Sequence, residues 1–145
     1  MNLKALERVE SLIRAHAVWI LRQRSKMKTR AVHELPAIGD RSAYHAHQQE
    51  AQTFVTLCLQ ALTSQEQFPP HVVHIKNHRT RWGSCSKQGN LNFNYRIVLL
   101  PVELAEYIIV HELCHLYEMN HSPRFWRQVA RFIPDYAVRR KRLRD

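Results

Sequence analysis

The chain has 145 residues, a length that suits one domain able to bury a core without covalent staples. Its three cysteines, Cys58, Cys85 and Cys114, are too few for a disulfide framework and form no Cys-x-x-Cys pair, so we expect reduced thiols. The net charge of +10 favours anionic partners such as nucleic acid, although solvated faces of terminal helices would carry the same charge.

The expected organisation is a single domain over residues 1–145, mainly helical over residues 1–70, with a sheet and further helices over residues 71–145. Apolar residues at helical spacing predict an amphipathic helix in the first two dozen residues. Charged residues interrupt this apolar pattern, which therefore matches neither a signal peptide nor a membrane span. We expect a cytoplasmic protein without a membrane partner; the sequence does not indicate its oligomeric state.

A second helix is predicted from Tyr44 to Leu62, a stretch that is rich in Ala, Gln and Leu and contains no Gly or Pro. Pro69 and Pro70 would stop this helix. Residues 71–76 then alternate with β-branched side chains, as a half-buried strand does. The chain thus changes from helix to sheet near residue 71.

A β-hairpin is predicted next, because strand-like residues 81–86 and 91–95 flank the turn signal Lys87-Gln88-Gly89-Asn90. Strict alternation in the second strand would place its apolar residues in the core. The opposite face would carry Asn92, Asn94 and Arg96. We therefore expect a small antiparallel sheet or hairpin at this point.

The C-terminal part is predicted to hold two further helices. Ser122 followed by Pro123 is typical of a helix N-terminus, and this helix would run to Phe132. Pro134 would end it, and Asp135 is placed to cap a short basic helix at the end of the chain.

Between these parts, residues 103–120 contain no Gly or Pro and predict a helix that carries His111, Glu112 and His115. Residues four apart share one face of a helix, so the two imidazoles can bind one cation while the carboxyl lies beside it. His121 follows six residues later. The complete pattern would arise by chance in only about 0.3% of such chains, so it indicates a candidate zinc site.

Two residues compete for the place of third ligand. On a continuous helix, Glu118 falls close in azimuth to His111 and His115. His121, beyond the helix end, can fold back and approach the metal from a new direction, as tetrahedral coordination requires. We prefer His121, which leaves Glu118 to orient an imidazole through its other ring nitrogen.

Three protein ligands would leave a fourth position open for water, which is typical of a catalytic metal site. Bound zinc lowers the pKa of such a water, and Glu112 could take its proton and later return it to the leaving group. The pattern therefore favours hydrolysis. The alternative is a metal-free helix whose histidines merely pair with carboxylates.

Three sequence blocks occur in order between about Arg79 and Arg140: Arg81-Trp82-Gly83-Ser84-Cys85-Ser86, then Gly89-Asn90-Leu91-Asn92-Phe93-Asn94, then His111-Glu112-Leu113-Cys114-His115 with Asn120-His121-Ser122-Pro123-Arg124-Phe125-Trp126. They resemble the YgjP-like family of bacterial zinc metallopeptidases. The resemblance implies one zinc ion, or another divalent metal, bound by His111, His115 and His121 with Glu112 as catalytic base. It also implies an α+β, zincin-like domain with N-terminal helices, a hairpin strand that flanks the metal cleft, and C-terminal helices after the metal-binding helix.

The spacing of the three histidines also equals that of the metzincins. Metzincins place Gly where this chain has Glu118, and a later Met supports their metal from below, whereas no Met follows Met119 here. The metzincin assignment fails on both counts.

The hairpin is a candidate substrate site, because a strand edge beside a metal can pair with an extended peptide through backbone hydrogen bonds. Its candidate contacts are Trp82, Ser84, Asn92 and Asn94. A hairpin that only serves folding and has a polar outer face would explain these residues equally well.

A zinc-dependent metallopeptidase is our first functional hypothesis. The alternative is a metal-dependent hydrolase of nucleoside triphosphates, since the chain is strongly basic and a metal suits phosphates, although no Gly-rich phosphate loop is present in the sequence. The arginines that could neutralise phosphates are Arg79, Arg81, Arg96 and Arg124. A third hypothesis is a DNA-associated protein, either a binder or a protease acting on DNA-bound proteins.

Overall fold

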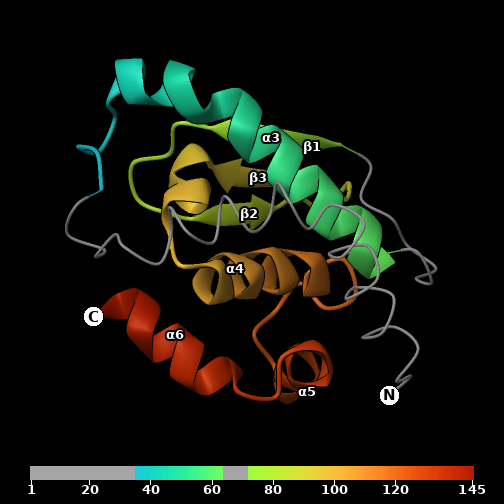
Figure 1. Ribbon diagram of the computed structural model, residues 1–145. Helices are drawn as coiled ribbons and strands as arrows, with labels where there is room; N and C mark the ends of the chain where they lie inside the picture. Colours follow the sequence, from blue (N-terminus) through green and yellow to red (C-terminus); the bar gives the residue numbers. More distant parts are fainter. Residues whose placement is uncertain (1–34, 64–71) are drawn as a thin grey trace.

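The computed structural model describes residues 35–63 and 72–145 (Figure 1). The helix predicted for the first two dozen residues and the stop at Pro69-Pro70 lie outside these described residues. The elements are α3 (Arg41–Thr63), β1 (Val73–Lys76), β2 (Gly83–Cys85), β3 (Leu91–Asn94), the 3-10 helix η2 (Tyr95–Leu99), α4 (Val102–Cys114), α5 (Pro123–Phe132) and α6 (Tyr136–Arg144). The α+β class predicted from the sequence is confirmed.

Helix α3 confirms the helix predicted from Tyr44 to Leu62. The carboxylate of Asp40 accepts a hydrogen bond from the main-chain nitrogen of Ala43 at 3.0 Å and so caps the first turn. The buried side chains of α3 recur at helical spacing, which gives the helix one apolar face. They are Ala51, Phe54, Val55, Leu59 and Ala61.

The three strands form one sheet in the order β1-β3-β2. β2 and β3 form the predicted antiparallel hairpin, in which Ser84 lies opposite Asn92, and Gly89 in its turn has a positive φ of 85°. β1 pairs parallel with β3, with Ile75 opposite Phe93. The hairpin is therefore confirmed, but the sheet as a whole is mixed and not antiparallel throughout.

Helix α4 lies between the sheet and the helices α5 and α6 (Figure 1). Most of its side chains are buried, because it meets neighbours on both sides. The single helix predicted over residues 103–120 is too long, since α4 ends at Cys114 and His115 occupies its C-cap. The main-chain nitrogens of Tyr117 and Glu118 both donate to the Cys114 carbonyl, which closes a tight turn after the helix.

Helix α5 starts and stops at the predicted residues, and α6 starts directly after Asp135, as predicted. Ser122 caps α5 by accepting a hydrogen bond from the main-chain nitrogen of Phe125. The predicted side-chain cap of α6 is wrong: Asp135 occupies the N-cap position, but its carboxylate makes no capping bond and instead pairs with Arg139 at 3.1 Å. Over residues 35–63 and 72–145, no helix has the length and apolar character needed to cross a membrane.

The end of β3 differs from the prediction at Asn94. This residue is only 3% exposed and does not form part of an open outer face. Its side-chain nitrogen donates to the carbonyls of His78 and Arg81, at 3.0 and 3.2 Å, and its side-chain oxygen accepts from the main-chain nitrogen of Arg96. Asn94 thus fixes the loop that leads from β1 to β2.

Replacing Asn94 with alanine should destabilise the protein by about 2 kcal/mol, because it removes three hydrogen bonds made by one buried side chain. Urea denaturation measures this change. Asn92→Ala is the matched control, since Asn92 is less buried and its side chain donates only to Ser84. An equal effect of both substitutions would contradict the role assigned to Asn94.

Candidate metal centre

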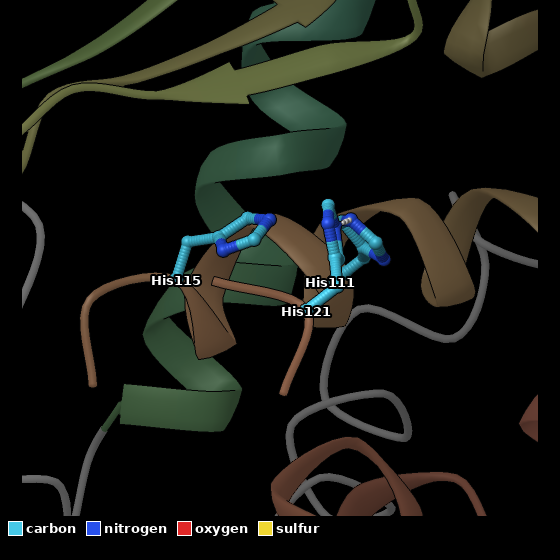
Figure 2. A group of neighbouring side chains, drawn as sticks. All are labelled: His111, His115 and His121. Atoms are coloured by element: carbon cyan, nitrogen blue, oxygen red, sulfur yellow. Dashed lines mark hydrogen bonds between the residues drawn. The ribbon is translucent and has the colours of Figure 1, made fainter. Parts of the chain in front are cut away.

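Three histidines from α4 and the loop after it lie together, with their rings turned toward one another (Figure 2). His111 belongs to the last turn of α4, His115 is its C-cap, and His121 precedes the N-cap of α5. One ring nitrogen from each lies within 4.8 Å of those of the other two. The Nε2 atoms of His111 and His121 are 3.0 Å apart.

Both helix histidines are held through Nδ1. The Nδ1 of His115 lies 3.0 Å from the main-chain oxygen of Glu118. Because a carbonyl oxygen only accepts, His115 donates its Nδ1 proton, and its Nε2 keeps a free lone pair. The Nδ1 of His111 lies 3.3 Å from the hydroxyl oxygen of Tyr107. The Nε2 of His115 can therefore bind a metal, and so can the Nε2 of His111 when its Nδ1 donates to the Tyr107 hydroxyl.

This donor set fits a tetrahedral metal ion. Zinc–nitrogen bonds of about 2.0–2.1 Å would place two imidazole nitrogens about 3.3 Å apart, close to the separation of His111 and His121. Burial lowers the pKa of His111 to about 3, and the charges of His115, His121 and Arg140 add to this effect. Burial is also the largest cause of the lowered pKa of His115. Neutral imidazoles are the form that a metal binds.

Glu118, the competing third ligand, is not part of the three-histidine group. Because α4 ends at Cys114, Glu118 does not share a helical face with His111 and His115. Its carboxylate lies 4.0 Å from the Nε of Arg124. The hydrogen bond that orients His115 comes from the main chain of Glu118 and not from its side chain.

Aromatic rings from α5 pack against the histidines. The buried ring of Phe125 stacks on His115 with ring centres 4.5 Å apart. The indole of Trp126 stacks on His121 at 5.8 Å and lies 5.9 Å from His111. These rings restrict rotation of the imidazoles, so the first turn of α5 helps to fix the geometry of the site.

Glu112 follows His111 and is buried, with 7% of its surface exposed. Burial raises the pKa of its carboxyl to about 7, although the positive charge of Arg81 opposes this rise. A Cβ atom at Gly83 in β2 would lie 2.7 Å from Cγ and 2.9 Å from Oε1 of Glu112. The strand approaches Glu112 this closely only because residue 83 has no side chain.

Gly83→Ala should therefore lower any hydrolytic activity that depends on Glu112 by about 100-fold, because the added methyl group displaces the Glu112 carboxylate, and a shift of about 1 Å can cost this much. Metal content should stay unchanged, since the three atoms nearest the added methyl group belong to Glu112 and Asn92 and not to the histidines. Ser84→Ala is the control, because Ser84 points to the other face of the sheet. Full activity in a folded Gly83→Ala variant would show that the carboxylate position is not critical.

The hairpin candidates for substrate contact are not gathered around Glu112. Side chains alternate along a strand, so Ser84 and Asn92 lie on the face opposite Gly83, where they hydrogen-bond to each other at 3.3 Å. Asn94 is buried beneath the loop before β2. Trp82 lies beside the hairpin with the Arg96 guanidinium 5.4 Å from its ring centre.

The candidate arginines are dispersed. Arg81 is exposed and near enough to Glu112 for its charge to act on that carboxyl. The side chain of Arg124 is 81% exposed on the first turn of α5. Arg79 lies beside Gly39, before α3. Arg81 thus acts on Glu112, and Arg124 lies near Glu118, which is three residues from His115 and from His121.

Two residues of the centre were not predicted from the sequence. Tyr107 lies four residues before His111 and so shares its helical face, a signal that was present in the sequence. Gly83 interrupts a strand pattern, which is typical of a close backbone approach. Neither signal says which neighbour is approached, because that depends on how β2 packs against α4.

Comparison with known proteins agrees with this geometry. The model of the YgjP-like metallopeptidase domain matches residues 32–145. Together with the three-histidine group, this match identifies a metallohydrolase. The match covers well over half of the chain, which therefore belongs to the YgjP-like family.

Among solved structures, the crystal structure of the metallopeptidase zymogen of Pyrococcus abyssi abylysin is similar to this chain. It shares 26% sequence identity with a TM-score of 0.48, and the alignment covers 66% of this chain and 90% of that chain. No curated protein matches the sequence significantly.

Proposed function

We propose that the protein is a zinc-dependent metallopeptidase in which Glu112 activates a water molecule. The observation that carries this proposal is the position of Glu112, which follows His111 in α4, is buried, and lies against the main chain of Gly83. This arrangement puts a proton acceptor, a metal site and a strand edge within one small region.

The three histidines would hold the metal through Nε2, since Tyr107 and the Glu118 carbonyl occupy Nδ1 of the two helix ligands. Zinc in such a site lowers the pKa of a water molecule toward neutrality and polarises a carbonyl oxygen. Glu112 then accepts the proton of the attacking water and passes it to the leaving amine. Its raised pKa suits both transfers, because a group that titrates near neutral pH gives and takes protons readily.

A peptide substrate is supported by the position of β2. Among the described residues, this strand lies at one edge of the sheet, and its main chain approaches Glu112 at Gly83. An extended peptide can add to such an edge through backbone hydrogen bonds, which would place a scissile carbonyl beside the carboxylate.

The test is to load the protein with zinc and incubate it with a peptide library and, separately, with nucleoside triphosphates. We expect peptide cleavage that a chelator abolishes and added zinc restores. Phosphate release without cleavage of any peptide would refute the proposal in favour of a phosphoanhydride hydrolase. Binding of DNA that is lost at high salt but survives chelation would instead support the DNA-associated alternative.

A further inference from the structure

Arg140 of α6 lies half-buried next to the metal centre. Its guanidinium carbon is 4.6 Å from the centre of the Trp126 ring. The same indole stacks on His121 and also packs against His111. One aromatic ring therefore connects this arginine with two of the three histidines.

The Trp126 ring is a firmly held platform. Tyr136, at the start of α6, stacks on it with ring centres 5.2 Å apart and an interplanar angle of 16°. Phe125 meets it edge to face at 4.9 Å. A guanidinium above a fixed indole gains a cation–π attraction and keeps its planar fork of N–H donors in one orientation.

The neighbouring arginine has very different partners. Arg139 is paired with the carboxylates of Glu106 and Asp135, both at 3.1 Å, and also donates to the Glu103 carbonyl. Arg140, by contrast, has no carboxylate within 4.0 Å and no hydrogen-bond acceptor among residues 35–63 and 72–145. A partly buried charge without a counter-ion is costly unless another group neutralises it.

We propose that Arg140, oriented by Trp126, binds a carboxylate of the substrate, and that it directs cleavage toward peptides with an acidic side chain or a free C-terminal carboxylate near the scissile bond. The inference rests on the proposed peptidase function and adds the substrate class. A guanidinium matches a carboxylate because two parallel N–H donors meet its two oxygens.

The charges around the centre are complementary to such a substrate. Arg81 lies on the Glu112 side, and the exposed Arg124 extends from α5. Glu118, an acidic side chain in the loop after α4, lies 4.0 Å from the Nε of Arg124. The net charge of the chain, +10, adds a long-range attraction for anionic peptides.

The experiment compares three fluorogenic peptides with the same cleavable core. One carries an acidic side chain beside the cleaved bond and an amidated C-terminus, the second ends in a free carboxylate beside it, and the third is neutral and amidated. The variants are Arg140→Gln, Arg140→Lys and, as a matched control, Arg142→Gln, which removes the same charge from the exposed face of α6. Binding is measured separately by fluorescence anisotropy with the zinc-loaded Glu112→Gln protein.

We expect Arg140→Gln to raise KM roughly 10- to 100-fold for one or both carboxylate peptides, to leave kcat and the neutral peptide nearly unchanged, and to weaken binding by the same factor. Arg140→Lys should restore part of the loss, because it keeps the charge but not the fork. Arg142→Gln should have little effect. The carboxylate peptide with the larger rise in KM shows whether Arg140 binds an acidic side chain or a C-terminal carboxylate.

Equal losses for all three peptides, or a loss of bound zinc, would overturn the proposal, because either result would show a structural role of Arg140. A larger loss for a nucleoside triphosphate than for any peptide would assign the arginine to phosphate instead. Arg140-dependent binding of carboxylate peptides that the wild type never cleaves would refute the peptidase function while supporting the carboxylate site.

Discussion

Glu112→Gln should bind zinc as the wild type does and lose between about 100-fold and 10,000-fold in hydrolysis, which is the usual contribution of a general base. Glutamine has nearly the same shape as glutamate, so it still fits against Gly83, but it cannot accept a proton from water. Steady-state cleavage of the best library peptide, together with metal analysis of the same preparation, measures the effect.

The matched control is Glu103→Gln, an exposed residue in the first turn of α4. It changes the charge of the same helix by the same amount but lies away from the histidines. If Glu112→Gln kept wild-type activity, Glu112 would not be the base. If it lost its metal, the carboxylate would act in metal binding and the activity loss would have another cause.

His121→Ala should lower the affinity for zinc by more than about 100-fold and abolish hydrolysis. This exceeds the loss expected when only an outer partner of a ligand is removed, which is about 10- to 100-fold. His121 is exposed, so its truncation leaves no cavity in the core and the fold should persist. Competition with a chromophoric chelator gives the affinity, and thermal denaturation verifies the fold.

Glu118→Gln separates the two candidates for the third ligand. It removes the carboxylate but keeps the main-chain carbonyl that orients His115, so zinc affinity should change little. The opposite pattern, with zinc lost in Glu118→Gln and retained in His121→Ala, would make Glu118 the ligand and contradict the assignment made from the geometry.

The sequence predicted those features that depend on neighbouring residues. His111 and His115 are four residues apart, a spacing that places them on one helical face whatever surrounds them. The Ser122-Pro123 signal starts α5 because the cap is satisfied within its own first turn. The hairpin was predictable for the same reason, since its turn residues and alternation lie within one short segment.

Features that depend on distant contacts were not predictable. No Gly or Pro marks the end of α4, and the helix stops at Cys114 because the chain reverses there to bring His121 back to His111. Likewise, the parallel pairing of β1 with β3 joins strands that are not consecutive in the sequence. Asn94 has the alternation of an outward residue, but the loop before β2 covers it.

The hydrogen bonds that orient His111 and His115 differ in how easily a substitution removes them. His115 is anchored by the main-chain carbonyl of Glu118, which every amino acid at that position retains, so substitutions there can alter surface charge without loosening the imidazole. His111 depends on the hydroxyl of Tyr107, which a single change to phenylalanine removes. One of these hydrogen bonds therefore survives any substitution at its partner position, and the other depends on the side chain that evolution retains there. Among related proteins, changes in metal affinity should accompany substitutions at position 107 and not at position 118.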